Sequence, residues 1–170
     1  MADADVARYV QEAPDHLGII AEPEYRLQGR FEYTIVKSYP LCVCLHKDHP
    51  LAGKTTLSFA ELRDERFLAL DKRSHYQQMM NETAAKYRFT PNVVYETADV
   101  NQICNLINSG KGICVATNSP AFGTVFPNIR SIPLSDKEML YSIAFIYQRL
   151  DKLEPQARSF IEFVRKAQAE

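Results

Sequence analysis

The chain alternates short apolar runs with segments whose apolar residues recur at helical spacing. Near the N-terminus, Val6, Tyr9, Val10 and Ala13 predict one face of a helix that Pro14 ends. Apolar or β-branched runs predict strands over 17–20, 33–36, 41–45, 67–70, 93–97, 113–116, 129–132 and 141–147. Between them, helices are predicted over 74–87, over 99–110, and from residue 155 onward. This pattern is typical of an α/β fold.

Each of the later helices has an apolar stripe that we expect to be buried. The stripes are Met80, Ala84 and Tyr87; Val100, Ile103, Cys104 and Ile107; and Ala157, Phe160, Ile161 and Val164. Strands that alternate with such helices favour a parallel sheet with helices on both faces.

One ordered series of motifs carries most of the information in the sequence. The predicted strand 41–45 leads into a polar turn and then the tetrapeptide HPLA at 49–52. Ser58 and Glu61 follow at the spacing of a capping box, which opens a short helix. The next strand, 67–70, comes directly after it.

This series resembles the effector-binding domain of LysR-type transcriptional regulators, and the resemblance continues to the C-terminus. It implies two Rossmann-like lobes joined by crossing hinge strands, as in type II periplasmic solute-binding proteins. The first lobe would consist of residues 1–41 and 142–170, and the second of residues 42–141. By the same comparison, the first lobe is expected to be incomplete. The helix-turn-helix DNA-binding domain of the family is absent from these 170 residues.

Charge and composition narrow the possible partners. The formal net charge is −1, whereas proteins that bind nucleic acid need a basic surface. We therefore do not expect these residues to bind nucleic acid by themselves. No apolar run is long enough to span a bilayer, and the N-terminus lacks the regions of a signal peptide, so we expect a cytoplasmic protein without membrane contact. The four cysteines have apolar neighbours and are expected to be buried and reduced.

Two predicted strand-to-helix turns are candidates for a ligand site. Ser74, His75 and Tyr76 follow one strand, at a place where free backbone N–H groups and the helix dipole attract anions. Thr97 and Asp99 follow the next strand. Ligands of open α/β sheets bind outside the carboxyl ends of strands, and the resemblance places both turns at the cleft between the lobes. The plainer alternative is that Ser74 and Asp99 only cap their helices.

Other chemistry finds little support in the sequence. Cys42, Cys44, His46 and His49 could be taken for metal ligands, but side chains two residues apart on a strand stand too far apart to share one zinc ion. No nucleophile or phosphate-loop motif is present. We therefore expect neither an enzyme nor a cofactor.

The expected function is effector sensing and oligomerisation within a bacterial LysR-type regulator. A small polar metabolite would bind between the lobes and change DNA binding by the intact protein, which the resemblance implies to be a homodimer or tetramer. DNA would be contacted only through the absent N-terminal domain. The alternative is a free-standing solute-binding protein, against which the missing signal peptide argues.

Overall fold

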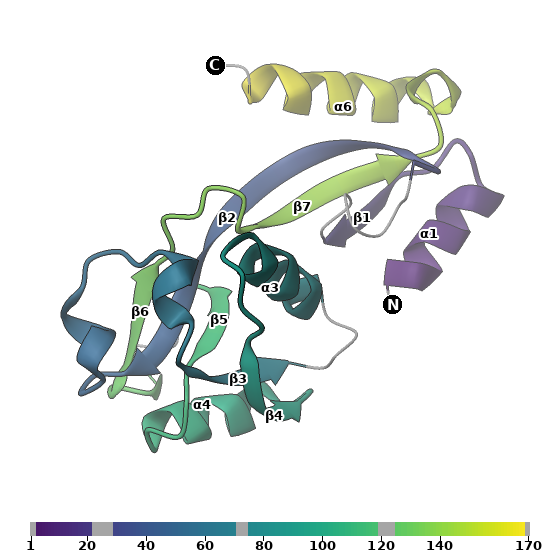
Figure 1. Ribbon diagram of the computed structural model, residues 1–170. Coiled ribbons are helices and arrows are strands. Elements are labelled where there is room, and N and C mark those ends of the chain that lie inside the picture. The colour runs from purple at the N-terminus through teal and green to yellow at the C-terminus, as the bar shows by residue number, and fades with distance from the viewer. Residues whose placement is uncertain (1–2, 22–28, 71–74, 119–124, 169–170) are drawn as a thin grey trace. The chain divides into compact units, whose positions relative to one another are not determined.

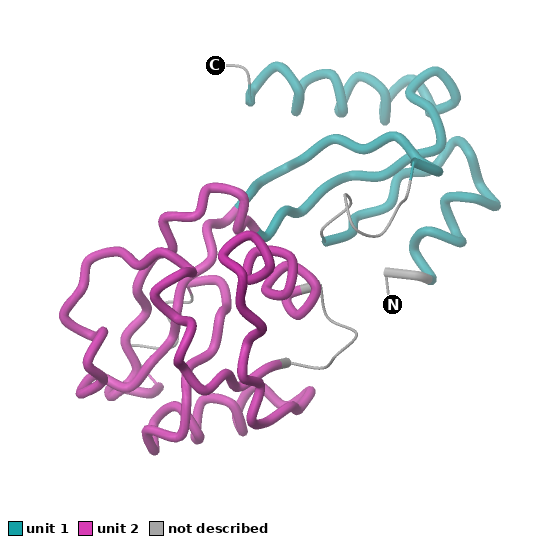
Figure 2. The backbone as a smooth tube through the Cα atoms, viewed as in Figure 1, with its two compact units in different colours: residues 1–38, 141–170 teal, residues 39–140 magenta. Residues whose placement is uncertain are grey.

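The chain forms two units, and strand β2 (Glu32–His46) contributes to both (Figures 1 and 2). Unit 1 comprises residues 1–38 and 141–170, and unit 2 comprises residues 39–140. The computed structural model describes residues 3–21, 29–70, 75–118 and 125–168. The lobe boundaries inferred from the sequence stay a prediction.

Unit 1 is a small sheet with a helix on each face. Strand β1 (Gly18–Ala21) pairs antiparallel with β7 (Leu140–Tyr147), which in turn pairs with β2. Helices α1 (Asp3–Glu12) and α6 (Pro155–Ala167) lie on opposite sides of these strands (Figure 1). Because successive side chains on a strand alternate between faces, Ile146 packs with Val10 of α1, whereas Tyr147 packs with Ile161 of α6.

A buried hydrogen-bond network ties α6 to the sheet. Tyr147 is fully buried, and its hydroxyl lies 2.9 Å from the hydroxyl of Thr34 on β2. Arg165 of α6 donates to both oxygens, at 2.6 Å to Tyr147 and 3.1 Å to Thr34. Near the end of α6, Gln168 donates to the backbone carbonyl of Val36 at 2.8 Å. The helix is thus held by directed polar contacts as well as by apolar packing.

Unit 2 contains a parallel arrangement of strands. Strand β3 (Arg66–Leu70) pairs in parallel with β4 (Asn92–Thr97). On the other edge of β3, a parallel bridge joins Phe67 to Ile113, just before β5 (Cys114–Thr117). Strand β5 and strand β6 (Ile129–Pro133) then pair antiparallel with the second half of β2.

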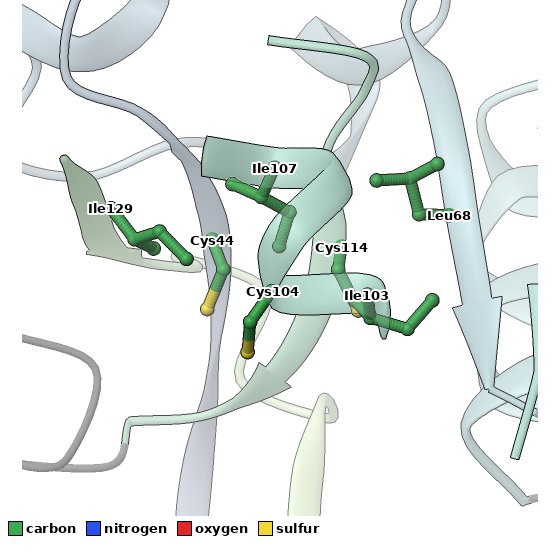
Figure 3. Packing of buried hydrophobic residues seen from close by; sticks show 7 residues of the cluster. All are labelled: Cys44, Leu68, Ile103, Cys104, Ile107, Cys114 and Ile129. Atoms are coloured by element: carbon green, nitrogen blue, oxygen red, sulfur yellow. The ribbon is translucent and has the colours of Figure 1, made fainter. Parts of the chain in front are cut away.

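The core of unit 2 forms where these strands meet helix α4 (Val100–Asn108). Figure 3 shows the buried cluster, which takes side chains from α4, β2, β3, β5 and β6. Its members are Cys44, Leu68, Ile103, Cys104, Ile107, Cys114 and Ile129. Helix α3 (His75–Lys86) buries Met79, Met80, Thr83 and Ala84 elsewhere in the same unit.

Local signals in the region 49–62 are confirmed. Residues Pro50–Gly53 and Phe59–Leu62 form two short 3₁₀ helices, η1 and η2. Ser58 accepts from the backbone of Ala60, and Glu61 accepts from the backbone of Ser58, which completes the predicted capping box. A third 3₁₀ turn, η3 (Leu150–Lys152), leads into α6.

The expectation of a parallel sheet is met in one part of unit 2 only. Parallel pairing is confined to β3, β4 and the bridge to Ile113, whereas β1 with β7, and β5 and β6 with β2, are antiparallel. The rule behind the expectation assumes that strands close in sequence pair side by side. Here β5 pairs with β2, which is distant in sequence, so tertiary structure determines its direction.

Two further expectations need correction. The predicted strands 33–36 and 41–45 are one strand, β2, because the backbone angle of Pro40 suits an extended chain and the ladders to β5 and β6 begin only after it. The predicted stripes are also incomplete as guides to burial. Val100 is 51% exposed and Phe160 is 46% exposed, although both occupy stripe positions.

Candidate functional site

The carboxyl ends of β3 and β4 lie side by side in unit 2. The two strands run in parallel, with Leu70 opposite Thr97 in the register. Each is followed by a helix, α3 after β3 and α4 after β4. This is the place in an α/β sheet where ligands bind, because the loops that leave parallel strands converge there.

The first predicted group of site residues follows β3. Ser74 lies outside the described residues. His75 is the first residue of α3, and Tyr76, which is half-buried, comes next in its first turn. The role of these three residues in binding stays a prediction.

The second predicted group forms a closed local structure at the start of α4. Asp99 is the N-cap, and its carboxylate accepts from the backbone of Asn101 at 2.8 Å. The backbone N–H of Asp99 in turn donates to the hydroxyl of Thr97 at 3.1 Å. The capping role expected for Asp99 is therefore present, and two local hydrogen bonds close the short Thr97–Asp99 turn at the strand end.

Gln102 was not among the site residues predicted from the sequence. Its Oε1 accepts from the hydroxyls of Tyr95 at 3.0 Å and Thr97 at 3.1 Å. Tyr95 and Thr97 lie on the same face of β4, so both can reach one acceptor. This arrangement leaves the Nε2 donors of Gln102 without a partner among the described residues. In the sequence, the signal for this contact was the pair of hydroxyl residues Tyr95 and Thr97, which stand two apart on a strand directly before the helix that Asp99 caps.

Polar groups therefore dominate this strand edge. Asp99 carries a negative charge at the surface, which disfavours a carboxylate placed next to it. Gln102 offers amide donors, and the N-terminus of α4 adds its partial positive charge. The arrangement suits a small ligand with hydrogen-bond acceptors.

The four cysteines belong to the buried part of unit 2. All four are free and buried, as expected. Burial raises the pKa of Cys44 to about 12, with the Ser131 hydroxyl acting in the opposite direction, and burial also raises the pKa of Cys114. Among the described residues, no group of three or more His, Cys, Asp or Glu side chains is arranged to hold a metal ion.

A small apolar cavity lies beside the α4 turn. It measures about 30 Å³ and is lined by Cys44, Val100, Ile103, Cys104, Ile107, Cys114 and Ala116. This space is close to that of a single water molecule, and an apolar lining of this kind stays dry. A metabolite does not fit inside a cavity of this size.

Comparison with known proteins identifies the family. The family model for the LysR substrate binding domain matches residues 2–169. The chain belongs to the LysR substrate-binding domain family. The fold class expected from the sequence is thereby confirmed, with structural neighbours that are LysR effector-binding domains.

Two sequence relatives and one solved structure illustrate this membership. The HTH-type transcriptional regulator YnfL of Escherichia coli (strain K12) is 25% identical over 79% of this chain and 46% of the relative. The transcriptional dual regulator GltC of Bacillus subtilis (strain 168) is 27% identical over 69% of this chain and 39% of the relative. The BenM effector binding domain with its effector benzoate superposes with a TM-score of 0.73 at 19% identity, covering 99% of this chain and 76% of that chain.

The two regulators are much longer than this chain, which spans less than half the length of each. The LysR substrate-binding domain belongs to transcriptional regulators, a family without enzymatic activity, which agrees with the expectation that the chain is not an enzyme. Within the described residues, no helix is both long and apolar enough to cross a membrane.

Proposed function

We propose that this chain senses a small polar metabolite and regulates transcription as part of a longer LysR-type protein. The observation that carries the proposal is the parallel pairing that sets Leu70 opposite Thr97, since it brings the carboxyl ends of two strands, each followed by a helix, to one edge of unit 2. We assign ligand contacts to Ser74, His75, Tyr76, Thr97 and Asp99, and add Gln102. The family match favours this function over a free-standing solute-binding protein.

The proposed mechanism is a shift between pre-existing conformations. A ligand that binds one arrangement of the protein more tightly than another increases the population of that arrangement by its difference in binding free energy. In the intact regulator, a homodimer or tetramer located in the cytoplasm, this change would alter how its helix-turn-helix domains contact DNA. The effector-binding domain would touch no DNA itself.

A thermal-shift screen over small polar metabolites tests the proposal. A ligand that binds only the folded chain raises the unfolding midpoint in a concentration-dependent way. The dissociation constant of the best compound is then measured for the double variant Ser74→Ala, Thr97→Ala and for Gln102→Ala. Because each lost hydrogen bond costs about 1 kcal/mol, the double variant should bind at least about tenfold more weakly.

A matched double variant controls for general effects of removing hydroxyls. Thr90→Ala with Ser159→Ala deletes a threonine and a serine hydroxyl at positions outside the proposed site. This control should bind with unchanged affinity. Equal affinity of the Ser74, Thr97 double variant and the wild-type chain would refute the assigned site.

A further inference from the structure

A second hollow, in unit 1, has the character of an anion site. It measures about 430 Å³, a size typical of pockets for small molecules. Its lining combines residues at the end of α1, before β2 and after β7, namely Gln11, Arg30, Phe31, Gln148 and Arg149. All five belong to unit 1, whereas the β3 and β4 strand ends belong to unit 2.

The hollow carries two guanidinium groups and no carboxylate among its described lining residues. A neighbouring hollow of about 520 Å³ is lined by two arginines, Arg149 and Arg158, but also by three acidic residues, Glu32, Asp151 and Glu162. Those acidic groups would repel an anion from the neighbouring hollow. The contrast gives the first hollow the more positive lining of the two.

The two arginines differ in how they are held. Arg149 is oriented by Asp151, which accepts from its Nε at 2.9 Å and from its Nη2 at 3.0 Å. This bidentate contact leaves Nη1 available on the other edge of the guanidinium group. Arg30 has no hydrogen bond or ion pair with any described residue.

The remaining lining residues add an apolar surface from Phe31 and a hydrogen-bonded side chain from Gln148. The ring of Phe31 is half-buried against the cluster of Val10, Ile20 and Ile146, which fixes its position. Gln148 donates to the carbonyls of Val10 at 3.2 Å and Gln11 at 2.6 Å. The last carbonyl groups of a helix carry partial negative charge, which would repel an anion nearby. The two hydrogen bonds from Gln148 satisfy carbonyl groups of this kind at the end of α1.

We propose that this hollow is a second ligand site, which takes a small carboxylate with an apolar or aromatic body. Arg30 and the free edge of Arg149 would bind the carboxylate, in the geometry that guanidinium groups favour. Phe31 would pack against the body of the ligand. The proposal is independent of the ligand site at the β3 and β4 strand ends.

The test is an NMR titration of the 170-residue chain with sodium benzoate at constant ionic strength. We expect saturable shifts of the backbone amides of Gln11, Phe31 and Gln148. Arg30→Gln should raise the dissociation constant about tenfold, as expected for loss of a charged hydrogen-bond donor. Arg8→Gln removes the same charge from exposed α1 and should change the dissociation constant by less than about twofold.

Each alternative result has a defined meaning. Shifts that stay linear with benzoate concentration, or an unchanged dissociation constant in Arg30→Gln, would overturn the proposed site. Acetate or inorganic phosphate binding as tightly as benzoate would overturn the assigned apolar body of the ligand. Shifts confined to 97–102 would report the strand-end site alone, and would likewise contradict a second site in unit 1.

Discussion

Close backbone contact explains why Gly112 precedes β5. A side chain carbon at this position would lie 2.5 Å from the carbonyl oxygen of Arg66 and 3.0 Å from Cγ of Leu68. The next residue, Ile113, donates to that same carbonyl at 2.9 Å and so joins β5 to β3. The absence of a side chain at Gly112 allows this parallel bridge to form.

We therefore expect Gly112→Ala to lower the free energy of unfolding by about 1–3 kcal/mol, because the added methyl forces backbone atoms apart. Gly53→Ala is the matched control, since nothing lies within 4 Å of the added carbon there. The control should change stability by less than about 1 kcal/mol in either direction. Urea unfolding of both variants measures the difference. Equal stability of the two would contradict the tight contact at Gly112.

Burial also sets the chemistry of the thiols, with a consequence for stability at alkaline pH. The pKa of Cys44 is raised from 9.0 in the unfolded chain to about 12. Above pH 9 the unfolded chain loses a proton that the folded chain keeps, so the free energy of unfolding falls as the pH rises through this window. Below pH 9 the Cys44 thiol keeps its proton in both states, so its contribution to the free energy of unfolding is fully retained.

The expected result is a steeper alkaline loss of stability in the wild-type chain than in Cys44→Ala, measured by urea unfolding between about pH 7 and about pH 10. Asp48→Ala, at a position without a thiol, serves as the comparison and should keep the wild-type slope. Identical slopes in the wild-type chain and Cys44→Ala would show that this thiol ionises equally in both states.

At the scale of elements, the position of α6 on its sheet depends on the buried hydroxyl of Tyr147. Tyr147, Thr34 and Arg165 form a network in which each member has a partner on another element. Removing a member leaves buried polar groups without partners, and such groups cost free energy. The packing of α6 against the sheet therefore depends strongly on this network, although the outer face of the helix is exposed.

Tyr147→Phe should lower the free energy of unfolding by about 1–3 kcal/mol, because the Thr34 hydroxyl loses a buried partner. Amide hydrogen exchange in α6 should accelerate more than exchange in α4. Tyr33→Phe is the control, since Tyr33 is 39% exposed on the same strand as Thr34. Comparable losses in the two variants would mean that the Tyr147 hydroxyl adds nothing specific to α6.

For the whole molecule, charge is the property that bears on function. The 170 residues carry a formal net charge of −1. Specific recognition of DNA needs phosphate contacts from basic side chains as well as an element that reads base edges. The relatives are transcriptional regulators, yet this chain spans less than half of their length.

The chain by itself is expected not to bind duplex DNA with sequence selectivity. A mobility-shift or fluorescence-anisotropy titration at moderate salt should show no saturable binding to promoter fragments, with or without a ligand. The variant Asp99→Asn, which makes the net charge less negative, is a useful control and should behave alike. Sequence-selective binding that weakens with salt would contradict the assignment of DNA contacts to another part of the regulator.

Much of the local structure was determined by the sequence itself. The capping box at Ser58, the N-cap at Asp99 and the apolar runs that became strands all rest on contacts between near neighbours, and local rules describe such contacts well. The ordered motifs between 41 and 70 also led to the family, which the match over residues 2–169 confirmed. The proposed ligand residues followed from the position of turns after strands, and their role stays a prediction.

Strand partners were decided only by the tertiary structure. The pairing of β5 and β6 with β2, and the continuity of β2 through Pro40, join residues far apart in sequence, where hydrophobic pattern sets no direction. The same holds for Gln102, whose orientation depends on two hydroxyls of another element, and for the hollow at Arg30, whose walls come from three separate segments. Local patterns specify which residues form each element, whereas long-range packing specifies which elements meet.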